Sequence, residues 1–166
     1  MVTRRYFLKT MSMASAGLAL GTGDLLHAQT ASPKKGRGDK VKIAYIGIGN
    51  RGEQIIEDFA RTGMVEVVAL CDVDWRYAEK TFNDYPKAKK FKDWRVMFDE
   101  FGKSIDAILV ATPDHTHAGV TAHAITLGKH CYTQKPLTHS VYESRLLTKL
   151  AKKYCVATQM GNQGNS

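Results

Sequence analysis

The chain has 166 residues, 43% of them hydrophobic and 24% charged, which is the composition of an ordinary globular protein with one substantial core. Its net charge of +8 would suit a nucleic-acid partner, but residues 1–40 hold seven Lys/Arg and two Asp and so account for +5 of it. Because the basic residues gather near the N-terminus and no nucleic-acid-binding motif is visible, the composition argues against nucleic-acid binding.

Residues 1–29 are predicted to be an export signal. Residues 3–9 read TRRYFLK, which resembles the twin-arginine consensus. The uncharged stretch over residues 10–23 is too short and too weakly hydrophobic to form a stable membrane span. This pattern predicts export to the periplasm by the twin-arginine pathway; the alternative is a disordered basic tail. Residues 30–40 are predicted to be a polar linker, and residues 41–166 a dinucleotide-binding domain.

The glycine motif that follows Val41–Ile46 is the most informative local pattern. A mostly apolar run, typical of a strand, leads into Gly47, Gly49 and Gly52, and an apolar-periodic helix follows. In such a G-x-G-x-x-G motif, Gly47 allows a tight turn and Gly49 lets backbone amides approach a pyrophosphate. Gly52 lets the helix pack close to the strand, with its positive end toward the anion.

An acidic residue at the expected distance supports this interpretation. Residues 65–70 read as a second strand, and Asp72 lies 20 residues after Gly52, where a carboxylate binds a ribose 2′-hydroxyl. The alternative role of Asp72, as a helix cap, can be filled by Asp74. A carboxylate repels a 2′-phosphate, so we expect NAD rather than NADP, although Arg76 could accommodate that phosphate.

The remaining elements alternate between strands and helices. Strands are expected at residues 41–46 and 65–70, around Phe91, and at 105–111, 129–134 and 155–160, with helices at 52–61, 74–83, 94–101, 114–127 and 138–153. Right-handed crossovers then predict an α/β fold with a doubly wound parallel sheet, a Rossmann NAD(P)-binding domain.

Polar residues gather at the predicted carboxyl ends of the strands, where open parallel sheets bind ligands. Lys135 is expected at the nicotinamide end, where it could contact a substrate hydroxyl and assist proton removal; the alternative is a solvated surface lysine. His117 is interpreted either as a nicotinamide neighbour or as a structural residue, and His115 as an exposed one. No metal site is predicted, because His115 and His117 do not share a helical face and no carboxylate cluster joins them.

The three cysteines, Cys71, Cys131 and Cys155, lie in or next to predicted strands without the spacing of metal ligands. They are therefore expected to be buried, reduced thiols.

The motifs GIGNRG, CDVD, ATPDHTH, QKP and TQMGNQG, in this order, resemble the Gfo/Idh/MocA family, which includes glucose–fructose oxidoreductase and inositol dehydrogenase. The resemblance covers residues 41 to 166. It implies a second α/β domain that carries much of the substrate site and mediates oligomers. That domain is absent here, so the chain is expected to be truncated before it, and the full-length form to be a homo-oligomer.

The resemblance also implies the residues of the site. Lys135 matches the lysine of the family's E-K-P motif and is expected to be catalytic, while Gln134 replaces the usual glutamate and removes a negative charge beside it. Asn162 and Gln163 fall where the last strand reaches the cleft. The cofactor-binding residues expected in this way are Gly47, Gly49, Asn50, Arg51, Gly52, Asp72, Thr112, Pro113, His117, Gln134 and Asn162.

The function expected from this resemblance is NAD(H)-dependent hydride transfer between the nicotinamide and a carbinol of a sugar, cyclitol or related polyol. One alternative is a hydrolase or lyase that retains NAD, oxidises a sugar transiently, eliminates a neighbouring bond and returns the hydride. Another is a cofactor-binding fragment without turnover, because an incomplete substrate cleft cannot exclude water.

Overall fold

A computed structural model describes residues 39–162 of the chain. The predicted export signal, nearly all of the predicted linker and Gln163 lie outside these residues, so what the sequence indicates for them stays a prediction. Among the described residues, no helix combines the length and the apolar character that crossing a membrane requires.

The described residues form a six-stranded sheet in the order β3-β2-β1-β4-β5-β6, and all of its neighbouring strands run parallel. The strands are β1 (Val41–Ile46), β2 (Val65–Cys71), β3 (Lys89–Phe91), β4 (Ala107–Val110), β5 (His130–Gln134) and β6 (Thr158–Gly161). The order of the strands reverses between β1 and β4. This arrangement confirms the predicted doubly wound α/β fold.

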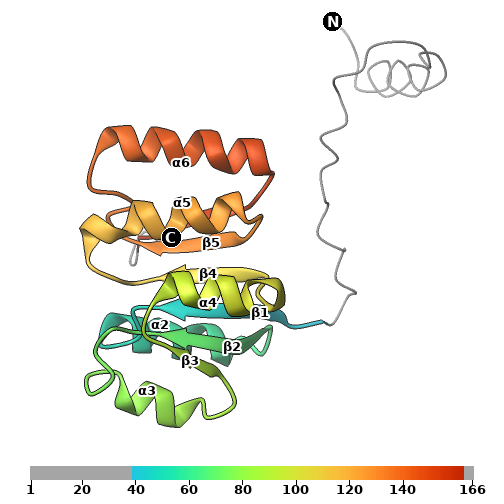
Figure 1. Cartoon of the computed structure of the whole chain (residues 1–166), viewed down its shortest axis with the longest axis vertical. Helices are drawn as coiled ribbons and strands as arrows, with labels where there is room; N and C mark the ends of the chain where they lie inside the picture. The colour runs from blue at the N-terminus through green and yellow to red at the C-terminus, as the bar shows by residue number, and fades with distance from the viewer. Residues whose placement is uncertain (1–38, 163–166) are drawn as a thin grey trace, which may run out of the picture. The chain divides into compact units, whose positions relative to one another are not determined.

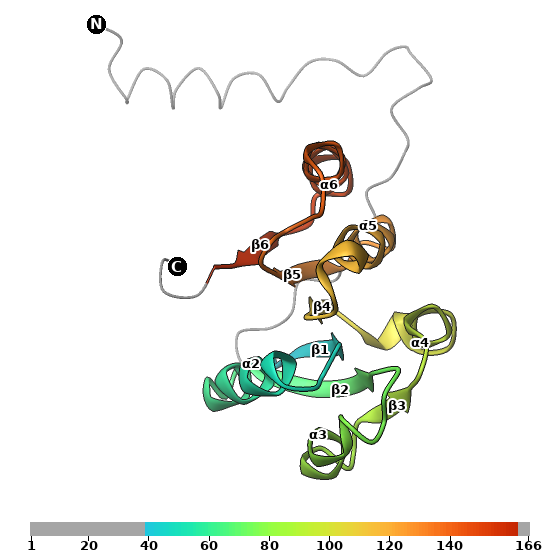
Figure 2. The same cartoon turned by 90° about the vertical axis from the view of Figure 1, so that its left-hand side faces the viewer.

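Helices cover the sheet from both sides (Figures 1 and 2). Two of them, α2 (Arg51–Arg61) and α3 (Glu79–Asp84), lie on one face, and α4 (Trp94–Phe101), α5 (His117–Thr126) and α6 (Val141–Tyr154) lie on the other. Short 3₁₀ turns, η1 (Gly102–Ser104) and η2 (Asp114–Thr116), precede β4 and α5.

Each face of the sheet contributes to a separate apolar cluster. Tyr45 and Leu109 pack in the cluster that contains Ile56 of α2, and Ile46 and Val110 pack in the cluster that contains Met97 of α4. Buried side chains therefore alternate between the faces along β1 and β4. This double coverage explains why both strands read as nearly continuous apolar runs.

The helix predicted over residues 74–83 is shorter than expected. The Asp74 carboxylate accepts hydrogen bonds from the amides of Arg76 and Tyr77, at 3.1 and 3.2 Å, and so stabilises a separate turn after β2. Helix α3 begins only at Glu79. The contacts of Asp74 are those of a capping aspartate, but they cap the turn over residues 75–78 rather than α3 itself.

The last strand begins later than predicted, because Cys155 ends α6 in a left-handed conformation with φ of 53°. Cys155 is exposed, so its predicted burial is wrong, whereas the predicted burial of Cys71 and Cys131 is confirmed. Burial raises the pKa of both of these thiols to about 12, which keeps them protonated near neutral pH.

Candidate functional site

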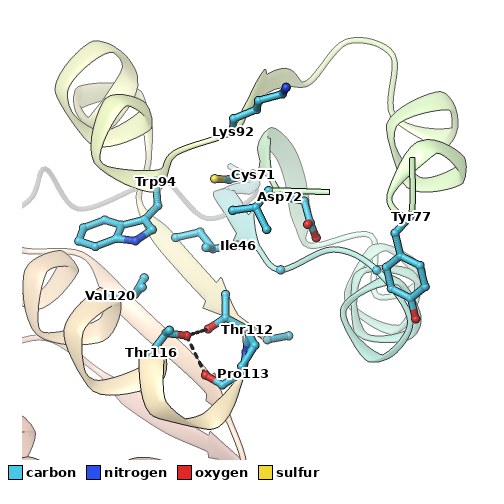
Figure 3. Close-up of a pocket in the computed structure, with 14 residues that line it drawn as sticks. Ile46, Cys71, Asp72, Tyr77, Lys92, Trp94, Thr112, Pro113, Thr116 and Val120 are labelled. Atoms are coloured by element: carbon cyan, nitrogen blue, oxygen red, sulfur yellow. Dashed lines mark hydrogen bonds between the residues drawn. The ribbon is translucent and has the colours of Figure 1, made fainter. Parts of the chain in front are cut away.

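A pocket of about 470 Å³ opens at the carboxyl ends of β2, β1 and β4, where the strand order reverses (Figure 3). Five of the predicted site residues line it, namely Gly47, Gly49, Asp72, Thr112 and Pro113. The other lining residues are Ile46, Cys71, Val73, Tyr77, Lys92, Trp94, Ala111, Thr116 and Val120. A crevice at this position is where doubly wound sheets bind their ligands.

The glycine loop fits against the neighbouring backbone because Gly47 and Gly52 lack a side chain. Gly47 has φ of 79°, and a Cβ built on it would lie 2.7 Å from the carbonyl oxygen of Ala111. A Cβ on Gly52 would overlap the carbonyl oxygen of Gly47. The tight turn expected at Gly47 and the close helix packing expected at Gly52 are thus both present.

The N-terminus of α2 has no side-chain cap. Asn50 occupies the capping position with φ of 47° and ψ of −105°, and its side chain makes no capping hydrogen bond. The Arg51 guanidinium donates instead to the Gln54 side chain, at 2.6 Å. An uncapped helix N-terminus offers amide donors and a positive dipole end, which together suit a phosphate group.

Asp72 joins the end of β2 to the glycine loop. Its Oδ2 accepts a hydrogen bond from the amide of Ile48 at 2.8 Å, and its Oδ1 accepts one from the amide of Asp74 at 3.0 Å. Each carboxylate oxygen has capacity for a further donor. Asp72 can therefore shape the loop and receive a ribose hydroxyl at the same time, while Asp74, predicted from the sequence to cap a helix, caps the turn before α3 instead.

The far wall of the pocket comes from the segment after β4. The Thr116 hydroxyl lies 2.7 Å from Thr112 Oγ1 and donates to the Pro113 carbonyl, also at 2.7 Å (Figure 3). These two contacts hold Thr112 and Pro113 in the wall.

Sequence reasoning missed Tyr77, Lys92 and Trp94, all of which line the pocket. Lys92 directly follows β3, so the strand-end rule that selected Asp72 could have found it. Tyr77 comes from the turn after Asp74, and its ring lies against Gly49. Trp94 is the first residue of α4, and its ring packs edge-on against His123 with centroids 5.3 Å apart. Neither Tyr77 nor Trp94 belongs to a sequence motif that would have predicted its position in the pocket.

Lys135, Gln134 and Asn162 lie at the carboxyl ends of β5 and β6 and are not among the residues that line this pocket. Lys135 is exposed. Gln134 is 5% exposed, and its Nε2 has no hydrogen-bond partner within residues 39–162. Gly161 leaves space for this amide, since a Cβ there would overlap Nε2. The predicted site residues thus fall into two groups. One lies at the pocket over β2, β1 and β4, and the other, Gln134, Lys135 and Asn162, lies at the ends of β5 and β6.

His117 is buried, at 1% exposure, between the segments that carry these two groups. Its Nε2 lies 2.8 Å from the carbonyl oxygen of Thr112, and its Nδ1 lies 2.7 Å from that of Pro136. Both ring nitrogens thus face the backbone. His115 is exposed, as expected. Across residues 39–162, no three His, Cys, Asp or Glu side chains are placed to hold a metal ion together.

Comparison with known proteins identifies the family. A family model described as "Oxidoreductase family, NAD-binding Rossmann fold" matches residues 41–162. The chain belongs to the Gfo/Idh/MocA oxidoreductase family. The residues present fit an NAD-binding domain of this family, because the loop excludes side chains at Gly47 and Gly52 and the start of α2 is uncapped.

Curated relatives of this family member include two from Shewanella. A glycosyl hydrolase family 109 protein of Shewanella pealeana is 26% identical over 184 residues, and an alpha-N-acetylgalactosaminidase of Shewanella oneidensis is 26% identical over 187. Each alignment covers 98% of this chain but 40% of the relative. The chain therefore spans about two fifths of the length of these relatives.

The solved structures with a similar fold include two dehydrogenases. The WlbA dehydrogenase from Bordetella pertussis, in complex with NADH and UDP-GlcNAcA, has a TM-score of 0.69 and 21% identity, with 75% of this chain and 38% of that one covered. The myo-inositol 2-dehydrogenase from Lactobacillus plantarum has a TM-score of 0.67 and 26% identity, with 74% and 36% covered.

We predict that Gly52→Ala destabilises the domain and weakens NAD binding. The new Cβ meets the Gly47 carbonyl, which is backbone and cannot rotate away, so the free energy of unfolding should fall by about 1–3 kcal/mol. Urea denaturation measures this change, and calorimetric titration measures the loss of affinity.

Gly119→Ala is the matched control, because a Cβ on this glycine of α5 meets nothing within 4 Å. It should leave NAD affinity unchanged and stabilise the fold by up to about 1 kcal/mol. Equal stability and equal NAD affinity for Gly52→Ala and wild type would show that the loop is not closely packed.

Proposed function

We propose that this chain is the NAD-binding part of an enzyme that exchanges a hydride with a carbinol carbon of a carbohydrate or polyol. The observation that carries the proposal is the position of the Asp72 carboxylate, which lines the same pocket as the glycine loop and accepts hydrogen bonds from the amides of Ile48 and Asp74. When bound there, NAD would supply the hydride acceptor. The carboxylate favours a ribose with a free 2′-hydroxyl and repels a 2′-phosphate, which supports NAD over NADP.

In the proposed reaction, Lys135 manages the proton of the substrate hydroxyl. As the carbinol C–H bond breaks and the hydride leaves, the O–H proton must pass to a base, and an amine at the end of β5 can accept it. Lys135 is exposed in the described part of the chain. We therefore propose that residues 1–166 bind NAD without turnover, and that catalysis requires further protein to exclude water from Lys135.

A second candidate is glycoside hydrolysis with the same hydride step, favoured by the names of the two Shewanella relatives. In such an enzyme the sugar is oxidised, the neighbouring glycosidic bond is eliminated, water adds, and the hydride returns to the sugar. The net products are the free sugar and the leaving alcohol, and no NADH accumulates. The two candidates would share the cofactor pocket and Lys135, and they differ in whether the glycosidic bond is cleaved and in the fate of the hydride.

An enzymatic assay distinguishes the two reactions. It uses the protein extended by any residues that its gene encodes after Ser166. With p-nitrophenyl α-N-acetylgalactosaminide, a glycosidase releases nitrophenol without accumulating NADH; with free sugars and inositols, a dehydrogenase accumulates one NADH per oxidised product. In either case Lys135→Met should lower kcat by about 10²–10⁴, the usual contribution of a general base.

Lys149→Met is the control, because Lys149 is an exposed lysine of α6 away from the strand ends. It should leave kcat unchanged. Full activity of Lys135→Met would refute the role of Lys135, and lack of both nitrophenol release and NADH formation would refute the carbohydrate assignment for these substrates.

The preference for NAD has a separate test in Asp72→Asn. Asparagine keeps one acceptor oxygen for the Ile48 amide and loses only the hydrogen bond from the Asp74 amide, so the glycine loop should hold its shape, but the charge that repels a 2′-phosphate is lost. We expect the ratio of NADP affinity to NAD affinity, measured by calorimetry on the 166-residue chain, to rise by about tenfold or more.

Asp74→Asn removes the same charge two residues away, at a side chain that does not line the pocket. The affinity ratio should stay within about threefold of wild type in this variant. An equal rise in both variants would mean that the general charge of the region, rather than Asp72, sets the preference.

A further inference from the structure

Two loops at the ligand edge of the sheet carry the two halves of the site. The segment after β4 holds Thr112 and Pro113 in the wall of the cofactor pocket. The segment after β5 carries Lys135, followed by Pro136. In the proposed reaction the hydride leaves the carbinol carbon and the proton leaves its hydroxyl oxygen, so these loops must keep a fixed relation to each other.

A single buried side chain spans the two loops. His117 begins α5, its Nε2 lies 2.8 Å from the Thr112 carbonyl oxygen, and its Nδ1 lies 2.7 Å from the Pro136 carbonyl oxygen. We propose that His117 is a positioning residue that donates from Nδ1 to the Pro136 carbonyl, ties the loop after β5 to the start of α5 beside Thr112, and so fixes Lys135 relative to the cofactor pocket. The functional importance of this contact rests on the proposed role of Lys135. The contact itself is independent of that role.

The shape of the imidazole ring suits this task. Its two nitrogens point in different directions from one rigid ring, and a carbonyl oxygen on each side can only accept. A neutral ring donates to one of the two carbonyls, and a doubly protonated ring donates to both. For the bridge to hold the loop that carries Lys135, the proton on Nδ1 is the essential one, because Nδ1 faces Pro136.

A second contact of the same kind provides the comparison. One turn further along α5, the hydroxyl of Thr121 lies 2.8 Å from that of Thr133 in β5, and both side chains are 1% exposed. This pair also joins α5 to β5 through buried polar atoms, but it does so within the strand and before the loop begins. Loss of the contact between Thr121 and Thr133 should lower the free energy of unfolding without increasing the backbone mobility of Lys135.

Two substitutions test the contacts of His117 with Pro136 and with Thr112 separately. The amide nitrogen of asparagine is as many bonds from Cα as Nδ1 of histidine, and that of glutamine is as many bonds from Cα as Nε2. His117→Asn should therefore keep the contact to Pro136, whereas His117→Gln should keep the contact to Thr112 and lose the one to Pro136.

The test measures the backbone mobility of Lys135 by ¹⁵N NMR relaxation in the nucleotide-free 166-residue chain. We expect the ¹⁵N–¹H nuclear Overhauser effect of Lys135 to fall in His117→Gln and to stay near the wild-type value in His117→Asn and in Thr121→Val. NAD affinity, measured in parallel, should change by less than about threefold in His117→Gln, because the pocket wall keeps its contact. A rigid Lys135 in His117→Gln, or an equal loss of rigidity in Thr121→Val, would overturn the proposal.

A measurement on the wild-type chain does not depend on whether the variants fold. Long-range ¹H–¹⁵N spectra of the histidine rings report which nitrogen of His117 carries a proton, and we expect a proton on Nδ1. An unprotonated Nδ1 would overturn the proposal by itself. Because neither NMR measurement uses a nucleotide, a chain that fails to bind NAD would refute the proposed function while leaving the bridge to be judged separately.

Discussion

The close contact between Gly52 and the carbonyl oxygen of Gly47 determines how β1, the glycine loop and α2 come together. A side chain at Gly52 would push the start of α2 away from the loop, and one at Gly47 would meet the backbone at Ala111, next to β4. The Asp72 carboxylate holds the same loop from the side of β2 through the Ile48 amide. Three neighbouring strands thus meet at one short loop, and the shape of the pocket follows from how closely they approach it.

The site has two parts with different surroundings. The pocket over β2, β1 and β4 is formed within the described residues, with Thr116 bracing one wall and Asp72 the other. Lys135 at the end of β5 is exposed, and the neighbouring Gln134 amide is buried without a hydrogen-bond partner in the described region. A buried amide donor without a partner is costly. The first part suits nucleotide binding, whereas the second leaves a polar group at the end of β5 without a partner in the described residues.

The sequence predicted the fold and the pocket through local rules. Strand–helix alternation predicted the sheet, and the spacing from Gly52 to Asp72 identified two residues whose contacts now explain the loop. The errors lie at the boundaries of elements. Asp74 caps a turn that precedes α3, and Cys155 ends α6 in a left-handed backbone conformation, so that β6 begins only at Thr158.

Contacts between distant segments could not be predicted from the sequence alone. The pairing of His117 with Pro136 joins residues 19 positions apart, and the ring of Tyr77 reaches Gly49 from a turn without any motif. The sequence suggested His117 as a nicotinamide neighbour or a structural residue. Its contacts with two backbone carbonyls support the second interpretation, and the first stays untested.

The most direct test of the central claim, that NAD binds in the pocket at the switch point, is a titration of the ¹⁵N-labelled 166-residue chain with NAD, followed by amide chemical shifts. We expect the largest changes at Ile48, Gly49 and Thr112, which surround the pocket or its loop, and no change at Gly63 and Gly128, which precede β2 and β5 at the opposite edge of the sheet. A folded chain whose glycine-loop amides do not respond to NAD, or whose changes centre on Gly63 and Gly128, would contradict this account.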